Sequence, residues 1–190
     1  NTYNYRVVMA TYDKSIDDED LLRKPIVLKV RRDGIPDRII HGLIQRTKLL
    51  GVEAELKPVY FWEATVVPSL WFLNLETECR HYLKKTAVDI VKEVLKEHGV
   101  TNFEFKVQAT LPVREFTVQY RETSFNFISR LLEEEGIFYW FEHTEQRHQL
   151  VFADTNSATQ NSPHLHKFPY GKGTISGADG GVIDNLEQSV

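Results

Sequence analysis

The chain has 190 residues and a formal net charge of −4, with 42% hydrophobic and 26% charged residues, as in an ordinary soluble protein of one large domain or two small ones. The negative charge argues against nucleic acid as the main partner, because phosphate binding requires a clustered positive surface. A single cysteine, Cys79, excludes an intramolecular disulfide and a cysteine-based zinc site, and no apolar run approaches the length of about 18 residues that would predict a membrane span.

The first part of the chain predicts short antiparallel strands. Apolar and β-branched residues indicate strands over residues 3–9, 25–30, 38–44 and 59–67. Asp33-Gly34 lies between the second and third of these runs and favours a tight hairpin, because it tolerates positive φ values. Pro68 ends the last run, since proline cannot donate to a strand ladder. We expect a small antiparallel β-barrel, or a sandwich, in a domain over residues 1–80.

Two helices are predicted in the next region, which we expect to be an α/β domain over residues 81–155. The first begins at Thr86, which has capping-box spacing to Asp89, and ends at Gly99, because glycine readily takes the left-handed conformation after a helix. The second begins at Thr123 and ends at Gly136. Helical spacing assigns its buried face to Phe125, Ile128, Leu131 and Leu132.

Strands flank the second helix. In the run from Arg114 to Tyr120, the side chains of Phe116, Val118 and Tyr120 alternate with polar neighbours, which is typical of a strand. Residues 137–141 are five consecutive bulky side chains and predict a strand buried on both faces. Its returning partner is expected over residues 149–152.

The C-terminal region, residues 156–190, changes in composition. Residues 154–181 are polar and rich in glycine, which indicates a loop or linker. Residues 182–190 have the pattern of the first strand of a second β-barrel. Because the chain opens on Asn1 rather than Met and stops without a closing turn, we expect it to be a piece of a longer protein.

The run from Arg114 to His143, REFTVQYRETSFNFISRLLEEEGIFYWFEH, closely resembles the signature of the VgrG and Rhs-associated Vgr family of type VI secretion spikes. Further likeness lies in Val66-Val67-Pro68-Ser69-Leu70-Trp71, in Thr86 to Gly99, and in His41-Gly42. The resemblance extends from about Tyr3 to Phe152. It marks these positions as family-signature and structural residues: Pro68, Trp71, Gly99, Arg114, Tyr120, Arg121, Glu122, Phe125, Leu131, Leu132, Glu133, Glu135, Gly136, Phe138 and Tyr139.

The resemblance implies an α+β, mainly β fold similar to the tail hub of contractile phages, with two related β-barrels and an α/β insert around a threefold axis. Members of this family continue into an oligonucleotide/oligosaccharide-binding fold and a trimeric needle. The implied role is structural: a homotrimeric base that joins the Hcp tube ring to the needle, with baseplate proteins and effectors as further partners and no cofactor. The implied location is the bacterial cytoplasm during assembly, followed by secretion to the exterior or a target cell.

Two groups of residues have side chains that could support chemistry. His164 and His166 have ligand-like spacing on a strand, but no further ligands are fixed beside them, so an exposed loop is the alternative to a metal site. The carboxylates of Glu133, Glu134 and Glu135 point about 100° apart on a helix and do not converge on a substrate; a solvated face or a subunit contact is expected instead.

Two serines and an aromatic run are further candidates for a functional role. Ser124 and Ser129 lack the Gly-x-Ser-x-Gly elbow of a nucleophile, so we predict no enzymatic activity. The aromatic run Phe138 to Phe141 fits either core packing or an intersubunit face. A carbohydrate- or peptide-binding β module remains the alternative function.

Overall fold

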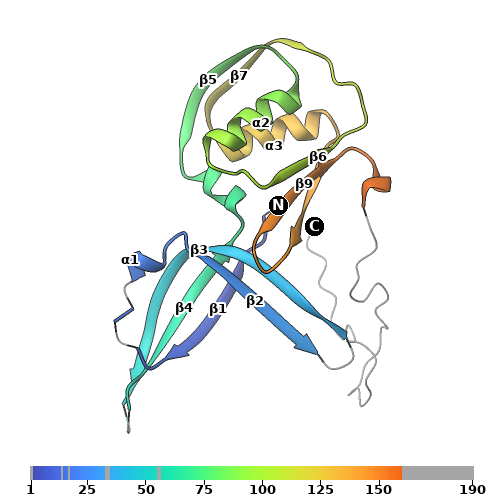
Figure 1. The fold of residues 1–190 in the computed structure, drawn as a ribbon. Helices are drawn as coiled ribbons and strands as arrows, with labels where there is room; N and C mark the ends of the chain where they lie inside the picture. Colours follow the sequence, from blue (N-terminus) through green and yellow to red (C-terminus); the bar gives the residue numbers. More distant parts are fainter. Residues whose placement is uncertain (1, 14, 17, 33–34, 55–56, 160–190) are drawn as a thin grey trace, which may run out of the picture.

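The computed structural model describes residues 2–13, 15–16, 18–32, 35–54 and 57–159. They form a curved antiparallel sheet and a second unit in which two helices lie between two smaller sheets (Figure 1). The strand order of the curved sheet is β1-β4-β3-β2. Its elements are β1 (Tyr5–Thr11), the short helix α1 (Asp18–Leu21), β2 (Pro25–Arg32), β3 (Ile35–Glu53) and β4 (Val59–Val67).

The curved sheet is half of a barrel. β3 is 19 residues long, and its register with β4 shifts between Ile44 and Arg46 and again between Leu49 and Gly51. Such bulges bend a strand and increase its twist. Within the described residues β1 and β2 stand at opposite edges, so the small antiparallel barrel or sandwich that was expected takes the form of an open half-barrel. The α+β, mainly β fold is confirmed.

The two strands of the expected hairpin, β2 and β3, are paired. Arg32 pairs with Ile35 across β2 and β3, whereas Asp33-Gly34 itself lies outside the described residues. The expected linker beyond Thr159, the His164/His166 pair and the start of a second barrel over residues 182–190 lie outside them as well. No helix among the described residues is long and apolar enough to cross a bilayer.

The second unit follows β4 through the 3₁₀ helix η1. A two-stranded antiparallel sheet pairs β5 with β7, and a three-stranded sheet has the order β6-β9-β8, with β6 parallel to β9. The elements are η1 (Ser69–Asn74), β5 (Thr77–Lys85), α2 (Ala87–Glu97), β6 (Phe103–Lys106), β7 (Arg114–Thr123), α3 (Ser124–Glu134), β8 (Phe138–His143), β9 (His148–Ala153) and the 3₁₀ helix η2 (Asn156–Ala158).

Both helices begin and end where the sequence predicts. The hydroxyl of Thr86 accepts from the backbone N–H of Asp89 in a capping box, and Thr123 accepts from Asn126 in the same way. Gly99 and Gly136 have φ values of +72° and +67°. After each glycine the next backbone N–H bonds to a carbonyl five residues back, at 2.8 Å in both cases, which closes the helix.

The core of the second unit surrounds the two helices and includes residues of η1, β5 and the three-stranded sheet. The apolar stripe of α2, formed by Ile90, Val91, Val94 and Leu95, is fully buried. In α3 the prediction was partly wrong: Phe127 takes the fully buried position, 5.6 Å from the ring of Tyr82, and Phe125 is only half-buried at the edge. β8 was expected to be buried on both faces, but it is an edge strand, so the aromatic residues from Phe138 to Phe141 are half-buried.

Candidate functional site

Arg114 fastens the start of β7 to the end of α3. Its guanidinium lies 2.6 Å from a carboxylate oxygen of Glu134 and 2.6 Å from one of Glu135. The hydrogen bond to Glu135, opposed by burial, raises the pKa of Arg114, and the hydrogen bond from Arg114 lowers the pKa of Glu134. The acidic run at the helix end therefore converges on an arginine of the same chain, which offsets the unfavourable interaction with the helix dipole.

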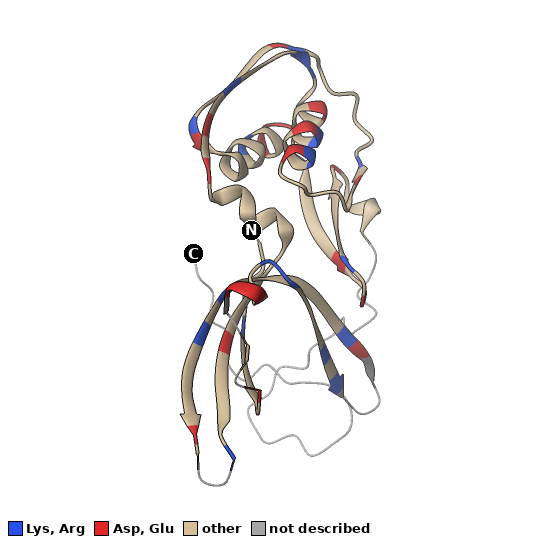
Figure 2. Ribbon diagram, turned by 60° about the vertical axis from the view of Figure 1, so that its left-hand side comes forward, with Lys and Arg blue, Asp and Glu red and all other residues tan. Residues whose placement is uncertain are grey.

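A second arginine extends this network along the outer side of α3. Arg130 contacts Glu122 of β7 at 2.8 Å and Glu134 at 3.3 Å, and it donates to the carbonyl of Val118. The hydrogen bond to Glu122 is the main cause of the raised pKa of Arg130. Acidic and basic residues consequently stand side by side over the helices (Figure 2). Three of the signature residues, Arg114, Glu122 and Glu135, are thus explained as ties between β7 and α3.

Another group of signature residues lines one groove between α3 and β8. The groove is open and has a volume of about 420 Å³. Burial, followed by the negative charge of Glu133, raises the pKa of Tyr139. The signature residues in its wall are Phe125, Leu132, Glu133, Phe138 and Tyr139, and they are joined by Asn126, Ser129 and Ile137. Leu131, by contrast, points into the core and is fully buried.

The outer face of the β5–β7 sheet is apolar and exposed. Phe116 and Tyr120 expose 60% and 65% of their surface, and Val118 between them exposes 38%. The polar residues Thr117 and Gln119 point inward and are buried. The alternation expected for this strand is therefore present, but with the apolar side chains toward solvent.

Arg121 is the extra residue of a β-bulge in this sheet. Glu78 pairs with Glu122 and Cys79 with Tyr120, which leaves Arg121 unpaired with a φ of +48°. Its guanidinium lies 5.3 Å from the centroid of the Tyr120 ring. The signature pair Tyr120 and Arg121 thus forms an exposed cation–π contact at the end of the apolar face.

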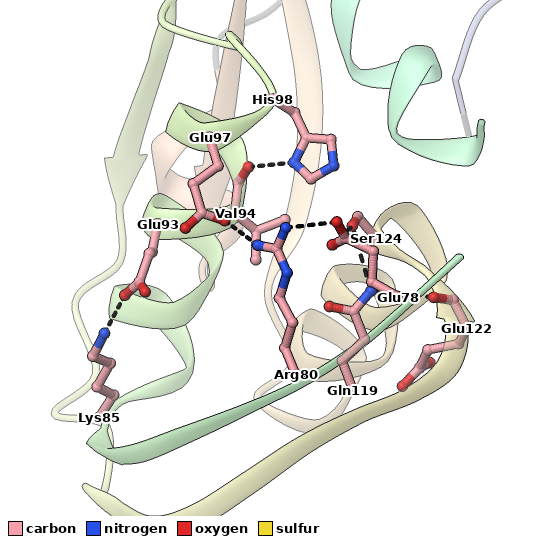
Figure 3. Close-up of polar contacts among 10 residues, drawn as sticks. All are labelled: Glu78, Arg80, Lys85, Glu93, Val94, Glu97, His98, Gln119, Glu122 and Ser124. Atoms are coloured by element: carbon pink, nitrogen blue, oxygen red, sulfur yellow. Dashed lines mark hydrogen bonds and ion pairs between the residues drawn. The ribbon is translucent and has the colours of Figure 1, made fainter. Parts of the chain in front are cut away.

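A polar cluster lies where β5 meets both helices (Figure 3). The guanidinium of Arg80 bridges Glu78 and Glu97, and Ser124 donates to Glu78 at 3.1 Å. His98 bonds through Nδ1 to the carbonyl of Val94 at 2.9 Å. Glu76, Glu78 and His98 place ligand atoms within 4.8 Å of one another. Because Arg80 already neutralises Glu78, this geometry fits an ion-pair cluster better than a cation site.

The remaining signature residues shape the backbone. Pro68 is buried at the start of η1, and Trp71 packs edge-to-face on Phe72 with ring centroids 5.5 Å apart. Gly99 and Gly136 end the helices. A Cβ atom at either glycine would meet no atom within 4 Å, so the positive φ, and not lack of space, favours glycine there.

One cluster was not anticipated from the sequence. His41 of β3, His143 of β8 and His148 of β9 meet beside Ser69, between the half-barrel and the second unit. The sequence gives three scattered histidines with no shared spacing, so only the tertiary structure brings them together. Ser69 and His148 are in hydrogen-bond contact, but the third group is another histidine and no carboxylate of the described residues completes a triad.

The chain is similar to known proteins along almost its whole length. The family model for the phage tail baseplate hub matches residues 1–189. The chain belongs to this hub family. The spike protein VgrG1a of Pseudomonas aeruginosa is 33% identical over 168 residues, or 88% of this chain, and the actin cross-linking toxin VgrG1 of Vibrio cholerae is 29% identical over 182 residues, or 96%.

The solved structures agree. An Escherichia coli component of the type VI secretion system, which is described as similar to the T4 phage tail proteins gp27 and gp5, aligns with a TM-score of 0.75 and 25% identity, covering 84% of this chain and 44% of that one. The resemblance to VgrG is therefore confirmed. This hub chain spans only 26% of the length of VgrG1a and 16% of the toxin.

Proposed function

We propose that this hub-family chain is a structural part of a type VI secretion spike: the trimeric base that joins the Hcp tube to the puncturing needle. The observation that carries the proposal is the match to a baseplate hub model along residues 1–189, together with spike proteins as relatives. A hub transmits force between the tube and the needle, so its requirement is rigidity, and no chemical step is assigned to it.

The internal ties of the second unit support a load-bearing role. Two arginines, Arg114 and Arg130, connect β7 to the end of α3 through three carboxylates. Both helices are capped at each end and packed on one core. Exposed ion pairs contribute little singly, but a network with partly buried members contributes more than its isolated pairs.

The exposed apolar surfaces support assembly with neighbours. Phe116, Val118 and Tyr120 form a contiguous face with Leu83, which exposes 55% of its surface on the paired strand. Contiguous apolar patches of this kind mark interaction sites more often than solitary exposed residues do. The open half-barrel likewise suits completion by further β structure.

The organisation we propose is a β-barrel domain over residues 1–80, an α/β insert over 81–155, and a linker with the start of a second β-barrel over 156–190. The first boundary falls within β5, which pairs with β7 of the insert. Baseplate proteins and effectors would be further partners of the assembled trimer. The protein would assemble in the bacterial cytoplasm and leave through the type VI apparatus toward the exterior or a target cell.

The oligomeric state tests this proposal. Multi-angle light scattering of the full-length gene product that carries this segment should give three times the chain mass, because a closed ring of heterologous contacts has a fixed number of copies. The isolated segment serves as the comparison, since needle contacts would be missing there. A full-length protein that stays monomeric at high concentration would contradict the proposal.

A peptide-binding module is the second candidate, and the groove between α3 and β8 favours it. The groove has apolar walls at Phe125, Phe138 and Tyr139, lies beside an edge strand, and carries the carboxylate of Glu133 at its rim. An extended peptide could add to the edge of β8 that is unpaired among the described residues. Two results together would favour this candidate. The full-length protein would not form a trimer, and it would bind peptides or cell-wall glycans in a way that Tyr139→Ala abolishes.

A further inference from the structure

The half-barrel meets the second unit through a joint built on three histidines. The turn of the β8–β9 hairpin lies against β3 (Figure 1), and the imidazoles of His41, His143 and His148 come together at this contact. His41 and His148 each expose only 6% of their surface. Tyr3 adds a hydrogen bond of 2.6 Å to the carbonyl of His41 and an edge-to-face contact with Phe141.

The hydrogen bonds assign a proton position to each ring. The backbone N–H of Ser69 can only donate, so Nε2 of His148, at 3.0 Å, must accept. A neutral imidazole then carries its proton on Nδ1, which donates to Nδ1 of His41 at 3.0 Å. The backbone N–H of His41 donates in turn to Nδ1 of His143 at 3.2 Å. Each ring thus uses its lone pair as an acceptor.

This arrangement fits only neutral rings. A second proton on any of the three would place two donors face to face at Ser69, at His148 or at the amide of His41, besides charging a group inside the joint. Burial lowers the pKa of all three histidines, that of His148 to about 4. For His143 a backbone hydrogen bond with His41 opposes this in part, and the neighbouring rings lower the pKa further for both His143 and His148.

The charged groups around the joint do not stabilise a protonated ring. From β3, Arg38 acts on His143 as a further positive charge. From β2, Lys29 lies 2.8 Å from Glu145 in the hairpin turn, so that carboxylate is already paired. Tyr3 is a further titratable group in contact with the rings of His143 and His148, and burial raises its pKa. In the described part of the chain no carboxylate makes a hydrogen bond or ion pair with any of the three rings.

We propose that the joint between the half-barrel and the second unit is acid-sensitive: protonation of the cluster of His41, His143 and His148 separates the β8–β9 hairpin from β3 and η1. Because the folded state holds the rings neutral, the opened state takes up more protons as the pH falls. The joint is closed above about pH 6.5, and its stability declines as the pH falls from there toward about 4.

Hydrogen exchange at the amides of Ser69 and His41 measures the opening directly, because both donate to cluster rings. After correction for intrinsic exchange, their protection should fall by up to about tenfold per pH unit for each coupled histidine between pH 6.5 and 4.5. A His41→Asn, His143→Asn, His148→Gln triple variant keeps acceptors but cannot be protonated, so its protection should stay level over this range.

His81→Asn is the matched control, since His81 is exposed on the β5–β7 sheet and should leave the wild-type profile unchanged. Should the triple variant not fold, ¹⁵N spectra of the wild-type rings at pH 7 decide instead. They should show Nε2 of His148 and Nδ1 of His41 without protons. Equal profiles for wild type and triple variant, or a protonated Nε2 of His148 at pH 7, would overturn the proposal.

Discussion

Phe127→Ala should lower the free energy of unfolding by about 3–5 kcal/mol, the largest effect that we expect of a single substitution in the second unit. Phe127 is fully buried in the core of the second unit, and its ring stacks on that of Tyr82 in β5 with centroids 5.6 Å apart. Removing the ring leaves a cavity that the surrounding β-branched and leucine side chains fill only in part. Urea unfolding followed by circular dichroism measures the loss.

Phe125→Ala is the matched comparison on the same helix. Phe125 is half-buried at the groove, so its truncation removes less packed surface and opens no closed cavity. We expect it to cost clearly less than Phe127→Ala, with an unchanged denaturant slope in both variants. Equal losses for the two would show that Phe127 does not occupy the centre of this core.

Gly42→Ala should destabilise the half-barrel by about 1–3 kcal/mol although it adds a single methyl group. A Cβ atom at residue 42 would lie 2.5 Å from Cγ1 of Val66 and 3.1 Å from the carbonyl oxygen of Val67. Both valines are fully buried, and Val66 is β-branched with little rotamer freedom, so the backbone of β3 or β4 must shift. Thermal unfolding measures the loss of stability, and tryptophan fluorescence can follow it because Trp62 lies on β4.

Gly51→Ala provides the control on the same strand. A Cβ atom there meets nothing within 4 Å and the residue does not have a positive φ, so stability should change by no more than about 0.5 kcal/mol. A Gly42→Ala variant as stable as Gly51→Ala would contradict the close approach of β3 and β4 at this point.

Local chemistry made the helices predictable. Thr86 with Asp89, and Thr123, carry the cap signals, and each stripe of apolar residues ends at a glycine that takes a positive φ. The same reasoning missed β5, because charged residues on both sides of Tyr82 obscure its alternation. β6 is only four residues long and depends on its parallel pairing with β9 for its position.

Burial was harder to foresee than secondary structure. The alternation in β7 identifies a strand but not which face meets the core, and here the apolar side chains face outward while Gln119 is fully buried. The amide nitrogen of Gln119 donates to the carbonyl of Glu122, whereas its amide oxygen has no hydrogen-bond partner among the described residues. The assumption that apolar side chains face the core therefore selects the wrong face of β7.

The signature residues fall into groups that sequence alone does not separate. Arg114, Glu122 and Glu135 make ion pairs, Phe125, Phe138 and Tyr139 line a groove, and the two glycines end helices. The run is contiguous in sequence, but its side chains serve different surfaces of the fold. The histidine joint could not be predicted from the sequence, because its members are far apart in the chain. They come from β3, β8 and β9 and share no spacing.

Electron cryomicroscopy of the full-length gene product mixed with its Hcp protein would show whether this chain is a rigid part of a spike base. We predict particles with threefold symmetry in which the half-barrel and second unit of each copy form a ring seated on the Hcp tube ring. Well-resolved particles in which these units are monomeric, or in which Hcp binds elsewhere or not at all, would contradict the account.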